Sequence, residues 1–101
     1  MTKRYSIEYV PEAIEHLKRL AARDRAYVVN EVEGQLSFQP TELTKHRKLL
    51  RKNPLYPWQL SAGDFRIYYD VMDAPKRLVM ILAVGIKRGN RLCIGGEVIK
   101  L

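Results

Sequence analysis

The sequence predicts an α+β fold in which a two-helix hairpin packs on one face of a mainly antiparallel sheet. Three observations predict it. An early segment alternates in polarity like a strand, two segments after it carry apolar residues at helical spacing, and three apolar runs joined by short turns come later. The expected order is β-α-α-β-β-β, in a single domain that spans residues 1–101.

A strand and the helical hairpin come first. Residues 5–10 alternate between apolar and polar side chains, as a strand with one buried face does. Pro11 suits the start of a helix over 11–22, because its missing N–H costs nothing in the first turn. Asp24 is a suitable cap for a second helix over 24–37. The apolar stripes of the two helices are Ala13, Leu17 and Leu20, and Val28, Val32 and Leu36.

A basic linker and three strands follow. Proline residues bound the linker, in which Thr41 is a candidate cap for a short helical turn. The strands are expected to begin at Trp58, at Phe65 and at Leu78, and residues 92–101 are expected to add one short edge strand. Short turns between consecutive strands favour an antiparallel meander.

Alternation along the strands assigns each side chain to a face. In the strand of residues 65–71, the apolar side chains share one face and Arg66 and Tyr68 share the other. In the strand that begins at Leu78, two sets result. Leu78, Met80, Leu82, Val84 and Ile86 are expected to face the helices, and Val79, Ile81, Ala83, Gly85 and Lys87 to lie on the opposite face.

The face opposite the helices is expected to form a shallow basic groove. Its floor would be backbone beside small residues, and its walls would carry Arg66, Lys87, Arg88 and Arg91. A guanidinium offers a planar fork to phosphate oxygens, and Tyr68 offers a ring and a hydroxyl to a nucleic acid. The alternative for Arg66 is a structural ion pair with Asp64 or Asp70.

The charge distribution points to a polyanionic partner. The net charge is +7, and residues 45–101 hold twelve Lys and Arg against four Asp and Glu. The partner could be nucleic acid, an anionic membrane or an acidic protein segment. The linker cations are expected along one rim of the groove, with a solvated helical face as the alternative. They are Lys45, Arg47, Lys48, Arg51 and Lys52, with His46 among them as a candidate general base or phosphate donor.

Several classes of protein are disfavoured. Cys93 is the single cysteine, which excludes an internal disulfide and fits a reducing cytoplasm. We expect no metal and no cofactor, because no pair of carboxylates, no ligand cluster and no glycine-rich phosphate loop is present. The longest apolar run has nine residues, against the roughly 20 that a membrane helix needs. A cytoplasmic protein without a membrane partner is therefore expected. His16 is expected on the solvated surface.

Residues 4–92 resemble the RelE/ParE superfamily of bacterial toxins, which are the toxin halves of type II toxin–antitoxin pairs. The most specific pieces are "GDFRIYY" at 63–69 and "VGIKR" at 84–88. The resemblance implies the same β-α-α-β-β-β fold, a cognate antitoxin and no metal. Its RelE branch implies a ribosome-dependent endoribonuclease (mRNA interferase) that inhibits translation. Arg66 then matches the phosphate-stabilising arginine, and Lys87 or Arg88 matches a second catalytic cation.

Two departures from the ribonuclease pattern keep a second function open. The strand that begins at Trp58 has none of the lysines common in that branch, and the neighbourhood of Cys93 lacks the late tyrosine that some of those enzymes carry. The alternative is a ParE-like toxin that traps DNA gyrase and catalyses no reaction.

Overall fold

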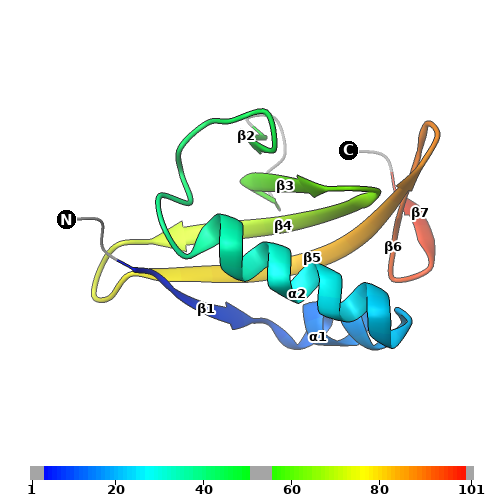
Figure 1. The fold of residues 1–101 in the computed structure, drawn as a ribbon, viewed down its shortest axis with the longest axis horizontal. Helices are drawn as coiled ribbons and strands as arrows, with labels where there is room; N and C mark the ends of the chain where they lie inside the picture. The colour runs from blue at the N-terminus through cyan, green and yellow to red at the C-terminus, as the bar shows by residue number, and fades with distance from the viewer. Residues whose placement is uncertain (1–3, 51–55, 100–101) are drawn as a thin grey trace.

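One sheet with two helices on one of its faces makes up the part of the chain that the computed structural model describes, residues 4–50 and 56–99 (Figure 1). The elements are β1 Ser6–Tyr9, α1 Pro11–Lys18, α2 Ala22–Leu36, β2 Arg47–Leu49, β3 Trp58–Ala62, β4 Phe65–Met72, β5 Leu78–Arg88, β6 Arg91–Ile94 and β7 Glu97–Ile99. The strands β2 to β7 lie in sequence order, and β1 pairs with β5. The α+β class is confirmed, and β1, α1, α2, β3, β4 and β5 reproduce the predicted order.

Three further strands, β2, β6 and β7, are added to that order. Strand β2 occupies the linker where a short helical turn was expected, and that prediction was wrong. Thr44 leads into β2, because its Oγ1 accepts hydrogen bonds from the N–H groups of His46 and Arg47. The C-terminal residues, expected as one short edge strand, form the hairpin of β6 and β7.

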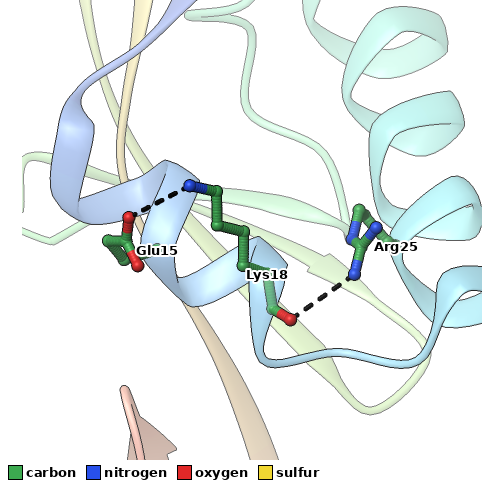
Figure 2. Close-up of polar contacts among 3 residues, drawn as sticks. All are labelled: Glu15, Lys18 and Arg25. Atoms are coloured by element: carbon green, nitrogen blue, oxygen red, sulfur yellow. Dashed lines mark hydrogen bonds and ion pairs between the residues drawn. The ribbon is translucent and has the colours of Figure 1, made fainter.

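The turn of the helical hairpin comes earlier in the chain than the sequence predicts. Helix α1 ends at Lys18, and α2 begins at Ala22, so Asp24 lies inside α2 and Ala21 takes the cap position. Arg25 of α2 accounts for the early end of α1. Its guanidinium donates to the carbonyl oxygens of Leu17, Lys18 and Leu20 at 3.0, 3.4 and 3.0 Å. Figure 2 shows Arg25 on the Lys18 carbonyl while the Lys18 ammonium pairs with Glu15.

Strand β5 has three neighbours. Strand β4 lies antiparallel along one side, in pairs that run from Phe65↔Ile86 to Met72↔Leu78. On the other side β1 runs parallel to residues 78–81, and β6 runs antiparallel to residues 85–88. Residues 82–84 of β5 therefore have no strand partner on that second side.

A bulge in β5 changes which residues face the helices. Tyr68 pairs with Ala83 but Tyr69 pairs with Ile81, so Leu82 is the extra residue. One extra residue reverses the alternation beyond it. Val79 and Ile81 consequently lie in the core beneath the helices, and assigning Leu78, Met80 and Leu82 to that face was wrong. Ala83 pairs beside Tyr68 and Gly85 beside Arg66, as predicted for the other face.

Each face of the sheet has its own core. The larger one confirms the helical stripes, because Ala13 and Leu17 of α1 and Val28, Val32 and Leu36 of α2 pack against the sheet. Their partners from the sheet are Leu60, Ala62, Ile67, Tyr69, Val79, Ile81 and Val84. The smaller one centres on Tyr68, Ala83 and Ile94. Its presence means that the second face of the sheet is partly covered.

Arg47 is a buried cation at the end of α2. Its Nη1 donates to the carbonyl oxygens of Gln35 at 3.2 Å and Gln39 at 2.6 Å. These carbonyls belong to the last turn of α2 and to the segment just after it, where a helix leaves acceptors without intrahelical partners. Placing Arg47 on the rim of the groove was therefore wrong, because its buried side chain joins β2 to α2.

We expect Arg47→Ala to lower the free energy of unfolding by about 2–3 kcal/mol, because it removes a buried side chain and two charge-assisted hydrogen bonds to partly buried carbonyl groups. Urea unfolding followed by circular dichroism measures the loss. The matched control is Lys48→Ala, which removes the adjacent exposed cation and should change stability by no more than about 0.5 kcal/mol. Equal effects of the two substitutions would contradict the role given to Arg47.

Candidate functional site

A pocket of about 460 Å³ opens on the sheet face that carries the smaller core. Strands β2 to β7 and the β5–β6 turn supply its walls, so residues from most of the second half of the chain meet there. The lining residues are Lys48, Gln59, Arg66, Tyr68, Lys87, Asn90, Leu92 and Ile99.

Strand register brings these residues together. Lys48 pairs with Gln59, Gln59 with Tyr68, and Tyr68 with Ala83, which makes one row across four strands. A second row runs from Ser61 through Arg66 and Gly85 to Ile94. Residues opposite one another in paired strands point to the same face. Two adjacent rows therefore place cations from different parts of the sequence beside one pocket.

Arg66 is held by its own hairpin. Its Nη1 donates to the carbonyl oxygens of Gly63 and Phe65, both at 2.8 Å. Among the residues that the structure describes, the ion pairs lie elsewhere, and neither Asp64 nor Asp70 pairs with Arg66. The structural ion pair that the sequence left open is absent from this part of the chain. The charge of Arg66 is therefore not neutralised by a neighbouring carboxylate there.

Lys87 and Arg88, the two candidates for the second cation, lie on different faces at the end of β5. Lys87 lines the pocket, and its backbone N–H donates to the carbonyl oxygen of Asp64 at 2.7 Å. Arg88 and Arg91 pair with each other across the β5–β6 hairpin, are exposed, and are absent from the pocket lining within the described residues. Alternation along β5 directs Arg88 away from the face that Lys87 occupies.

The linker cations divide in the same way. Lys48 on β2 lines the pocket, whereas Lys45 and His46 are exposed on the preceding loop, outside the described lining. Arg51 and Lys52 lie outside the described residues. Nucleic-acid binding by the linker stays a prediction. Of the described linker cations, Lys48 is the one that lines the pocket.

Tyr68 lies deeper than the sequence suggested. Its side chain is fully buried and stacks on Tyr56, with ring centroids 4.9 Å apart and ring planes at 25°. Burial raises the pKa of Tyr68 to about 12, opposed by the nearby Arg66 and increased by Tyr56. Its Oη has no hydrogen-bond partner among the described residues. Because Tyr56 covers its ring, Tyr68 contributes to the floor of the pocket and does not present an open stacking surface.

Gln59 and Asn90 are site residues that the sequence analysis missed. Gln59 is a buried polar residue on β3, and its Nε2 lies 3.5 Å from the Ser61 Oγ. Asn90 belongs to the β5–β6 turn, where Gly89 has a φ of +60°, which a glycine adopts readily. The sequence carries no signal for the burial of Gln59, because a polar residue between Trp58 and Leu60 is typical of a solvated strand face.

Other kinds of site find no support in the described part of the chain. No three His, Cys, Asp or Glu side chains gather there in a way that could hold a metal ion. No helix there is long and apolar enough to cross a membrane.

Comparison with known proteins gives one informative result. No family model and no curated protein matches the sequence. Among solved structures, a chain in the crystal structure of the RelBE2 toxin–antitoxin complex from Mycobacterium tuberculosis is similar, with a TM-score of 0.71 and 27% sequence identity. The match covers 83% of the present chain and 92% of that one. The resemblance to RelE-like toxins is thus confirmed in the fold.

Gly85, which pairs with Arg66, allows a test of how tightly the pocket floor is built. A Cβ at this position would lie 2.8 Å from the Cys93 carbonyl oxygen and 2.8 Å from Ile94 Cγ1. Gly85→Ala should therefore destabilise the protein by about 1–3 kcal/mol through overpacking. Gly34→Ala is the matched control, because a Cβ at this helical position meets nothing within 4 Å.

The control should raise stability by about 0.5–1 kcal/mol, since alanine favours a helix more than glycine does. Chemical denaturation of both variants measures the two changes, which should have opposite signs. A stabilising Gly85→Ala substitution would show that β5 and β6 do not pack as described.

Proposed function

We propose that this RelE-like domain is the toxin of a bacterial type II toxin–antitoxin pair and that it cuts messenger RNA bound to the ribosome. The observation that carries the proposal is the convergence of Lys48, Arg66 and Lys87 on one pocket. They come from three different strands, and no acidic side chain is among the described residues that line the pocket. Such a pocket attracts phosphate.

The chemistry that suits this pocket is cleavage by the RNA itself. The 2′-OH of the RNA loses its proton to water and attacks the adjacent phosphorus, the bond to the 5′-oxygen breaks as that oxygen takes a proton from water, and a 2′,3′-cyclic phosphate and a 5′-OH form. Negative charge builds on the phosphate oxygens in the transition state, and fixed cations stabilise it. The described lining holds no carboxylate and no imidazole. Electrostatic stabilisation is therefore the main contribution that we assign to the pocket.

Arg66 is suited to the central role. Its Nη1 is occupied by the carbonyls of Gly63 and Phe65, whereas its Nε and Nη2 donate to no other described residue. Three N–H donors therefore remain for phosphate oxygens, on a head group that is already oriented. We assign the second cationic role to Lys87 and not to Arg88, because Lys87 lines the same pocket.

A cognate antitoxin is the second part of the proposal. The similar chain from M. tuberculosis was solved as a toxin–antitoxin complex. An acidic antitoxin segment that covers Arg66 and Lys87 would neutralise the pocket and compete with RNA. Charge complementarity with a chain of net charge +7 would also speed association.

We expect Arg66→Ala to abolish growth inhibition and to slow cleavage by about 100-fold or more, as the loss of one transition-state donor does. The measurement is cleavage of a defined messenger RNA on purified ribosomes, with a gyrase supercoiling assay run in parallel. The matched control is Arg88→Ala, which removes the same charge from the exposed side of β5 and should cleave like the wild type.

The outcomes are distinct. Normal cleavage by a folded Arg66→Ala variant would exclude the assigned role of Arg66. A wild-type protein that leaves ribosome-bound messenger RNA intact but blocks gyrase would replace the ribonuclease with the ParE-like alternative.

A further inference from the structure

His16 of α1 is bound to the strand that carries the pocket. Its Nδ1 accepts a hydrogen bond from the backbone N–H of Val84 at 3.2 Å. The prediction that His16 lies on the solvated surface was wrong, because its side chain is partly buried. The two residues are 68 positions apart, so no local pattern indicates the contact.

The contact falls where β5 lacks a neighbouring strand. Residues 82–84 lie between the part of β5 that pairs with β1 and the part that pairs with β6. The bulge at Leu82 also interrupts the pairing with β4 at this point. His16 thus supplies an acceptor to a backbone donor that no strand reaches.

The same imidazole ring also lies close to the turn between β6 and β7. A Cβ on Gly95 would lie 3.2 Å from both Cδ2 and Nε2 of His16. His16 therefore binds β5 through Nδ1, and the opposite side of its ring lies where a side chain at position 95 would be. Strand β6 pairs with β5 next to this contact, at Gly85↔Ile94.

The hydrogen bond depends on the protonation state of His16. Nδ1 can accept from Val84 only in the neutral tautomer that carries its proton on Nε2, because an imidazolium has no acceptor. Burial lowers the pKa of His16, an effect that Glu12 opposes and Arg19 strengthens. The other elements in contact offer Val84 and Gly95, which carry no charge. The neutral form therefore prevails at neutral pH, and it is lost below the ordinary value of 6.5.

The contact is one residue away from the pocket. Val84 lies between Ala83, which pairs with Tyr68, and Gly85, which pairs with Arg66. Lys87 follows three residues later on the same strand. We propose that His16 is a positioning residue. In its neutral form the imidazole holds the Val84 N–H and so fixes the path of β5 that brings Lys87 to the pocket that Arg66 also lines, and protonation of His16 releases this path. The part of this inference that concerns cleavage of messenger RNA rests on the proposed ribonuclease function.

Two substitutions distinguish the role of the hydrogen-bond acceptor of His16 from the role of its titratable charge. His16→Asn keeps an acceptor oxygen near the place of Nδ1 and does not titrate, whereas His16→Leu removes the acceptor and keeps an apolar volume. Two readouts apply to the full chain between pH 5 and pH 8. One is the ¹⁵N–¹H resonances of Val84, Gly85 and Lys87, and the other is cleavage of messenger RNA on ribosomes.

In the wild type, we expect the three amide resonances to shift together below pH 6.5 as His16 is protonated, and cleavage to fall over the same range. His16→Asn should cleave like the wild type at pH 7.5 and lose both transitions. His16→Leu should stay folded and cleave about 10- to 100-fold more slowly at every pH, as a misplaced reactive group does.

The inference is overturned if the three resonances do not follow the titration of His16, or if a folded His16→Leu variant has wild-type activity and the wild-type pH profile. If the wild-type protein cleaves no messenger RNA, the proposed function fails. The amide resonances of the wild type and of His16→Asn then decide the positioning role by themselves.

Discussion

Strand β5 has eleven residues, and it pairs with three strands and lies in two different surroundings. Its first half pairs with β1 and lies beneath the helices, and its second half pairs with β6 and carries the pocket. The extra residue Leu82 makes both possible, because it lets Ile81 face the larger core while Ala83 faces the smaller one. Without this change of face, strict alternation would put Val79 and Ile81 on the side of the pocket. The rest of the structure is arranged around this bulge.

The pocket combines charge with an apolar support. Tyr68, Ala83 and Ile94 form a small core on its side of the sheet, with Leu92 and Ile99 packed against it. Apolar surroundings reduce the screening of nearby charges, so each cation acts more strongly on an anion than it would in open water. Placing Lys48, Arg66 and Lys87 around one pocket also costs free energy through mutual repulsion. The larger core beneath the helices provides stability that is independent of this arrangement.

Parts of this structure could be predicted from the sequence because their signals are local. The alternation of Phe65, Ile67 and Tyr69 assigned the faces of β4 correctly and so placed Arg66 on the face of the pocket. The helical stripes likewise needed only their own spacing.

The remaining features depend on partners that are distant in the sequence. Leu82 has the same chemical character as its neighbours, so nothing in the apolar run marks a bulge. Arg47 is buried among cations that are mostly exposed, because the end of α2 happens to present carbonyl groups to it. Strand β2 has three residues and owes its existence to pairing with β3. Lys48 reaches the pocket only through this pairing, which explains how a linker supplies a cation that the strand beginning at Trp58 lacks.

The parallel pairing of β1 with β5 has a consequence for synthesis of the chain. Ser6 pairs with Leu78, so the first strand stays unpartnered until most of the protein has been made. Contacts between residues so far apart form late and slow the assembly of a sheet. Because β5 also carries Gly85 and Lys87, the nascent chain cannot build its pocket before its last third has left the ribosome. The pocket, whose lining extends to Ile99, is therefore among the last parts of the described chain to form during synthesis.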